Sequence, residues 1–64
     1  MQRIIHDEQM NKAVFVVENG YVRIWYKETY QCWFLNDVSL QKAEKIETYE
    51  ELYALCVSGT ESLI

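Results

Sequence analysis

The sequence predicts an α+β fold: an antiparallel three- to four-stranded β-meander with one C-terminal α-helix packed on a sheet face. Two observations lead to this prediction. Segments rich in β-branched and aromatic residues alternate with turn-forming residues up to about residue 40, and a helix-start signal followed by an apolar stripe lies near the C-terminus. The chain of 64 residues has the length of one small domain, 1–64. Half of its residues are hydrophobic, a proportion that argues against a disordered chain.

The strongest local signal is Asn19-Gly20, which lies between two segments rich in β-branched and aromatic residues. Asn and Gly tolerate the two positive φ values of a type I′ turn, the favoured loop of a two-residue hairpin. Such a turn places Phe15 opposite Ile24. Because side chains alternate between the faces of a sheet, one face then becomes apolar through Ala13, Phe15, Val17, Val22, Ile24 and Tyr26. A slip of one residue would mix this set with polar residues.

The next strand-like segment, 30–35, extends the meander. With Glu28 and Thr29 as the loop, Trp33 lies opposite Ile24 on the apolar face. A longer, four-residue loop keeps the same facing. Trp33 is therefore expected in the core.

The segment that follows has two interpretations. Asn36 and Asp37 are turn formers, and a two-residue loop there would begin a fourth strand that ends near Ile46. In the alternative, the spacing of Leu40 and Ala43 fits one face of a helix. We favour the strand, because a separate helix start follows at once.

The last expected element is a helix that begins after Thr48. Residues 48–51 have the spacing of a capping box, in which the Thr48 hydroxyl accepts a hydrogen bond from the amide of Glu51. We expect the helix to span 49–58 and to end at Gly59. Its apolar stripe consists of Tyr49, Leu52, Leu55 and Cys56.

Charge argues against nucleic acid as a partner, and the distribution of apolar residues argues against a membrane. Residues 1–30 sum to zero, whereas residues 31–64 carry the whole net charge of −4. An acidic half repels phosphate backbones, which argues against nucleic acid. No segment approaches the roughly 20 apolar residues of a membrane span, and the N-terminus lacks the apolar core of a signal peptide. We therefore expect a cytoplasmic protein that does not bind membranes.

Residues suited to catalysis or metal binding are few and scattered. His6 is the only imidazole, Cys32 and Cys56 lack metal-ligand spacing, and the two glycines form no phosphate-binding loop. We expect no catalytic residue, no metal and no cofactor, and hence no enzyme. Both cysteines are expected to be free, partly buried thiols, with a Cys32–Cys56 bridge as the alternative.

The second face of the predicted sheet is where we expect binding. It is aromatic, although an antiparallel sheet with one solvated face usually alternates apolar and polar residues. Three arrangements would account for it: cover by the chain ends around Ile4 or Leu63-Ile64, packing of a second copy, or binding of a different partner. Trp, Tyr and Arg predominate in interface hot spots. The candidate partner-binding residues are Tyr21, Arg23, Trp25, Tyr30 and Phe34.

These observations indicate a small, non-enzymatic, intracellular protein-binding module. It would act as a regulator or inhibitor by occupying a partner surface, and it would form a homodimer, because association adds core that so short a chain lacks. The alternative is a role linked to nucleic acid. In that case the aromatic face would stack on single strands, or the acidic half would mimic DNA and block a nucleic-acid enzyme.

Overall fold

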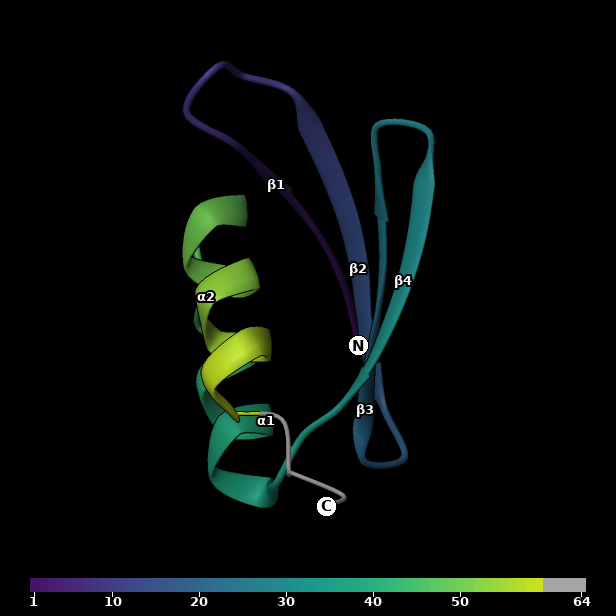
Figure 1. Cartoon of the computed structure of the whole chain (residues 1–64), viewed down its shortest axis with the longest axis vertical. Helices are drawn as coiled ribbons and strands as arrows, with labels where there is room; N and C mark the ends of the chain where they lie inside the picture. Colours follow the sequence, from purple (N-terminus) through teal and green to yellow (C-terminus); the bar gives the residue numbers. More distant parts are fainter. Residues whose placement is uncertain (60–64) are drawn as a thin grey trace.

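The computed structural model describes residues 1–59. Four antiparallel strands form one sheet in the spatial order β1-β2-β3-β4, with bounds β1 (Gln2–His6), β2 (Lys12–Glu18), β3 (Tyr21–Tyr26) and β4 (Thr29–Phe34). Two helices follow, α1 (Asp37–Ala43) and α2 (Tyr49–Gly59), and Figure 1 shows both on one side of the sheet. The α+β class and the meander are confirmed. The prediction of a single helix is wrong, because α1 stands where a fourth meander strand was expected.

The β2–β3 hairpin has the predicted register, with Phe15 opposite Ile24 and Val17 opposite Val22. Asn19 and Gly20 both adopt positive φ, 50° and 88°, as a type I′ turn requires. A Cβ on Gly20 would meet nothing within 4 Å. Glycine is therefore needed there for its backbone conformation and not for lack of space.

The β3–β4 register differs from the prediction by two residues. Lys27 and Glu28 form the loop, since Tyr26 pairs with Thr29. The Thr29 hydroxyl donates to the Tyr26 carbonyl at 2.8 Å, so Thr29 closes the hairpin instead of lying in its loop. Trp33 consequently lies opposite Val22. A shift of two residues preserves the facing of every side chain, so Trp33 remains on the apolar face.

Helix α1 begins where the sequence suggested a turn. The side-chain oxygen of Asn36 accepts a hydrogen bond from Ser39 N at 2.8 Å, which makes Asn36 a helix N-cap. Asp37 in the first turn and Lys42 in the last turn both complement the helix dipole. Asn and Asp favour both turns and helix N-caps, and in this structure Asn36 caps a helix.

One core joins the sheet to the helices, and its buried members are Ile5, Ala13, Phe15, Val22, Ile24, Leu35, Ala43, Leu52 and Cys56. The Tyr26 ring of β3 stacks on the Tyr49 ring of α2 with a centroid distance of 3.7 Å. Trp33 of β4 is half-buried and meets Tyr53 edge-on at 6.0 Å. Trp33 therefore lies at the margin of the core and not at its centre.

The two helices approach closely at Gly59. A Cβ on this residue would lie 2.3 Å from the Ser39 hydroxyl oxygen of α1, well inside contact distance. The sequence suggested Gly59 only as the end of a helix. In the structure it is the last residue of α2 and also allows α1 to pack against it. Within residues 1–59, neither helix has the length and apolar character needed to cross a membrane.

The predicted helix start at Thr48 is confirmed, since Glu51 N donates to the Thr48 hydroxyl at 3.3 Å. Thr48→Ala should lower the free energy of unfolding by about 0.5–2 kcal/mol, because one amide of the first turn loses its acceptor. Urea denaturation followed by circular dichroism measures the change. Thr48→Ser, which keeps the hydroxyl, is the control and should stay close to the wild type. Equal midpoints for Thr48→Ala and the wild type would show that the cap contributes nothing.

Candidate functional site

The side of the sheet that faces away from the helices, called the open face below, is built from rows of side chains. The strand registers align them across the sheet. One row crosses all four strands and consists of Ile4, Val14, Trp25 and Tyr30. The next row consists of Gln2, Val16, Arg23 and Cys32, and a shorter one of Glu18, Tyr21 and Phe34.

The open face exposes large apolar side chains to solvent. Phe34 is 67% exposed, Ile4 55%, Tyr30 54% and Trp25 39%. Solvated sheet faces usually carry polar residues at such positions, and contiguous exposed apolar patches mark interaction sites. The five predicted site residues all lie on this face, so the strand alternation read from the sequence placed them together correctly.

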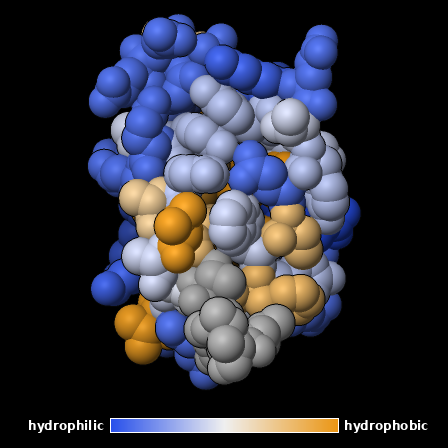
Figure 2. All heavy atoms as spheres, in the orientation of Figure 1, coloured by the Kyte–Doolittle hydropathy of each residue, from blue (hydrophilic) through white to orange (hydrophobic). Residues whose placement is uncertain are grey.

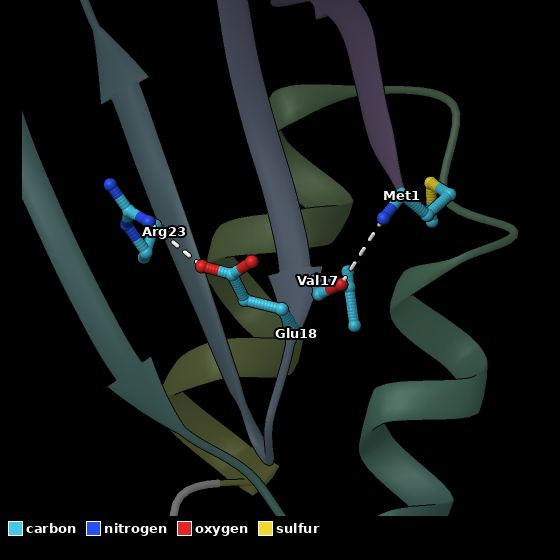
Figure 3. Close-up of polar contacts among 4 residues, drawn as sticks. All are labelled: Met1, Val17, Glu18 and Arg23. Carbon is cyan, nitrogen blue, oxygen red and sulfur yellow. Dashed lines mark hydrogen bonds and ion pairs between the residues drawn. The ribbon is translucent and has the colours of Figure 1, made fainter.

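The N-terminal segment does not cover the open face. It forms β1, an edge strand in the plane of the sheet. Its pairing with β2 extends to the first residue, where Val17 N donates to Met1 O at 3.0 Å and the Met1 amino group donates to Val17 O at 3.5 Å (Figure 3). The other suggested cover, Leu63-Ile64, lies outside the described residues.

The observed β3–β4 register creates two aromatic pairs on the open face. Tyr21 meets Phe34 edge-on with a centroid distance of 5.4 Å. Trp25 meets Tyr30 at 5.3 Å in a tilted arrangement. Both distances lie in the favourable range for aromatic contacts. In the register expected from the sequence, Trp25 would have faced Cys32, so these pairs depend on the two-residue shift.

Arg23 lies between the aromatic pairs and is held by neighbours on the same face. Its Nη1 lies 2.8 Å from Glu18 Oε1 (Figure 3), and its guanidinium carbon lies 5.1 Å from the centre of the Trp25 ring. The hydrogen bond to Glu18, followed by one to Tyr30, raises the pKa of Arg23. Sequence reasoning did not single out Glu18, although it lies on this face. The Glu18 carboxylate neutralises the cation at the centre of the open face.

Asp7 is a polar residue whose role the sequence did not reveal. Its carboxylate is buried in the β1–β2 connection, at the end of the molecule where Figure 2 shows hydrophilic residues gathered. It accepts hydrogen bonds from Gln9 N at 2.8 Å, from Asn11 N at 2.8 Å, from Asn11 Nδ2 at 3.0 Å, and from the Tyr26 hydroxyl. Asp7 thus ties the loop to β3.

These hydrogen bonds determine the chemistry of Asp7. The one from Tyr26, followed by those from Asn11 and Gln9, outweighs burial and holds the pKa of Asp7 well below its usual range. The same contact raises the pKa of Tyr26 to about 12. A carboxylate of such low basicity is a poor general base near neutral pH. His6, next in sequence, is exposed.

The described residues offer no metal cluster and no pocket. Between residues 1 and 59, no three His, Cys, Asp or Glu side chains gather to hold a metal ion, and no cavity is enclosed. The Cys32 thiol is free and exposed, so the alternative bridge to Cys56 is not formed. The expectation that Cys32 is partly buried is wrong, because it lies in the edge strand β4. Cys56 is buried in the core, where desolvation raises its thiol pKa to about 11.

Comparison of the chain with protein-family models, with curated proteins and with solved structures gave no match.

Proposed function

We propose that the chain is a non-enzymatic protein-binding module that regulates or inhibits a larger protein by occupying a surface on it with the open face. The observation that carries the proposal is the exposed aromatic cluster around Trp25, which no segment within residues 1–59 covers. The free, exposed Cys32 thiol is typical of a reducing compartment, so the proposal includes a cytoplasmic location.

The size of the open face suits a protein partner. Four strands about 4.8 Å apart, with about six residues each at roughly 3.3 Å per residue, give a face of about 20 by 20 Å. Because side chains project from the sheet, the accessible surface of this face is larger than its flat area. It is of the order of the roughly 600–800 Å² that one partner buries in a specific interface. Burial of aromatic side chains supplies most of the free energy in such interfaces.

The charge of the open face favours protein over nucleic acid. Proteins that bind single strands combine stacking side chains with a positively charged groove. Here the Glu18 carboxylate bonds Arg23, so the positive charge that a phosphate group would meet is already offset by a neighbouring negative charge. The net charge of −4, which lies in residues 31–64, adds a repulsion between the chain and a phosphate backbone. The aromatic residues alone would suit stacking, but their electrostatic setting does not.

Trp25→Ala tests the proposal, because Trp25 contacts both Tyr30 and Arg23 near the centre of the open face. Immobilised wild-type chain should capture a partner from the native cell lysate, and Trp25→Ala should lose it by about 30-fold or more, the scale of an interface hot spot. Quantitative mass spectrometry measures the loss. Circular dichroism should show that the variant remains folded.

Val57→Ala is the matched control, because Val57 is an exposed apolar residue on α2, away from the open face. It should capture the same partner as the wild type. The proposal would be contradicted if Trp25→Ala captured the same proteins in the same amounts as the wild type. A titration with single-stranded oligonucleotide serves as a separate arm, where binding that weakens steeply with salt would support the nucleic-acid alternative instead.

A further inference from the structure

The two edges of the sheet differ in how far the rest of the chain protects them. Beside β1, His6 forms a parallel bridge with Thr48. Arg3 Nη1 donates to the Glu44 carbonyl at 2.6 Å, and just beyond the strand Glu8 N donates to Glu50 Oε2 at 3.0 Å. The segment that joins α1 to α2 therefore lies against β1. Within residues 1–59, no other segment pairs with the outer edge of β4.

The register identifies which backbone groups of β4 point outward. Tyr26 and Thr29 close a two-residue hairpin, so the backbone of Thr29, Gln31 and Trp33 bonds to β3. The hydrogen bond from Leu35 N to Gly20 O at 3.1 Å continues this alternation. The N–H and C=O groups of Tyr30, Cys32 and Phe34 consequently point away from β3.

Strand β4 also lacks the residues that usually guard an exposed edge. Natural edge strands carry lysines, prolines or bulges that prevent pairing with another chain. The sequence of β4, TYQCWF, contains no charge and no proline, and every residue pairs regularly with β3. Edge β1 contains Arg3 in addition to its cover. An unguarded strand of high β propensity is a template for strand addition.

We propose that the free edge of β4 pairs antiparallel with β4 of a second copy, so that one continuous sheet runs through a symmetric dimer. A two-fold axis at Cys32 places Tyr30 of each copy opposite Phe34 of the other, so this pair occurs two times in the dimer. The two Cys32 residues exchange both of their N–H···O=C bonds at the centre. Both open faces then lie on the same side and form one aromatic surface of about twice the area.

The composition of β4 favours a second copy over another extended chain. Lys27 precedes the strand and Asp37 follows it. Antiparallel self-pairing brings Lys27 of each copy to the end where Asp37 of the other begins α1. Glu28, which directly precedes the strand, offsets part of this attraction. The uncharged strand itself creates no repulsion, and self-pairing sets Tyr30 against Phe34 of the second copy at two positions, an aromatic cross-strand pair. A peptide of different sequence would gain the same backbone bonds without this complementarity.

This inference does not depend on the binding role proposed for the open face, and Cys32→Lys tests it. The variant places two lysines opposite each other on the axis, and it should raise the dissociation constant of the dimer by about fivefold or more. Sedimentation velocity over a concentration series gives the constant. Ile4→Lys adds the same charge to the open face at the other edge and should leave dimerisation unchanged, as should Trp25→Ala.

Weakening by all three variants would show a dimer packed through its open faces and would overturn the edge proposal. A wild-type chain that stays monomeric throughout the series would overturn it as well. A monomeric wild type would leave the partner-capture test with Trp25→Ala intact, whereas a dimer packed through its open faces would place a second copy on the surface proposed for the partner.

Amide exchange measured by NMR gives a second readout that needs no substitution. The amides of Tyr30, Cys32 and Phe34 should exchange fast in dilute protein and become protected as the concentration rises. Those of Gln31 and Trp33 should stay protected throughout, because they bond to β3. Protection of the outward amides in the monomer would show that another segment of the chain already occupies the edge, and would overturn the proposal.

Discussion

Phe15→Ala is expected to remove most of the stability of this fold. Phe15 is completely buried in the middle of the sheet, opposite Arg3 on one side and Ile24 on the other. Deleting a buried Phe side chain costs about 3–5 kcal/mol, through lost transfer free energy and the cavity left behind. Chains of this length have a total stability of roughly 3–10 kcal/mol. Urea denaturation followed by tryptophan fluorescence should show the midpoint collapse.

The chain provides a matched control in its other phenylalanine. Phe34 is 67% exposed and lies on the open face. Phe34→Ala removes the same atoms from a solvated position and loses only the cross-strand contact with Tyr21, so its effect should stay within about 1 kcal/mol. Similar losses for the two variants would show that the open face is buried in the folded protein, and that the assignment of the two faces is wrong.

Asp7→Asn is expected to lower stability at neutral pH and to change how stability depends on pH. The amide cannot accept all the hydrogen bonds that Gln9, Asn11 and Tyr26 donate to the carboxylate. The folded-state pKa of Asp7 is depressed below the ordinary value near 3.9. Its contribution is therefore fully present above that value and is lost as the pH falls through it toward the folded-state pKa.

Thermal melts at pH 7, 5 and 3 test this sign. The gap between wild type and Asp7→Asn should be widest at pH 7, nearly as wide at pH 5, and clearly narrower at pH 3. Glu28→Gln, which removes an exposed carboxylate from the β3–β4 loop, should keep the wild-type midpoint at pH 7. A gap that is constant from pH 7 to pH 3 would show that the Asp7 charge does not stabilise the fold.

Features set by neighbours in sequence were predictable. The positive φ values at Asn19 and Gly20 belong to those two residues, and the turn then aligns β2 with β3 residue by residue. The cap at Thr48 needs only an amide three positions away. The alternation of side chains along each strand also placed the candidate site residues on one face, because every second residue of a strand points to the same side of the sheet. These features are local, so the sequence was sufficient for them.

Features that depend on distant contacts were not predictable in the same way. A two-residue shift between β3 and β4 leaves every side chain on the same face, so the apolar pattern could not choose the loop. Asn36 suits a turn and an N-cap equally. The helix forms because it buries Ala43 in the core and packs Ser39 against Gly59, and both contacts involve residues distant in sequence.

The same distinction holds for the polar contacts of the candidate site and its surroundings. The aromatic pairs of the open face follow from the shifted register, and Asp7 meets Tyr26 across 19 positions of sequence. Residue types and spacing determined which residues share a face. Which of them touch was settled by packing, because contact energies between distant segments are realised only after the sheet and helices have closed on one core.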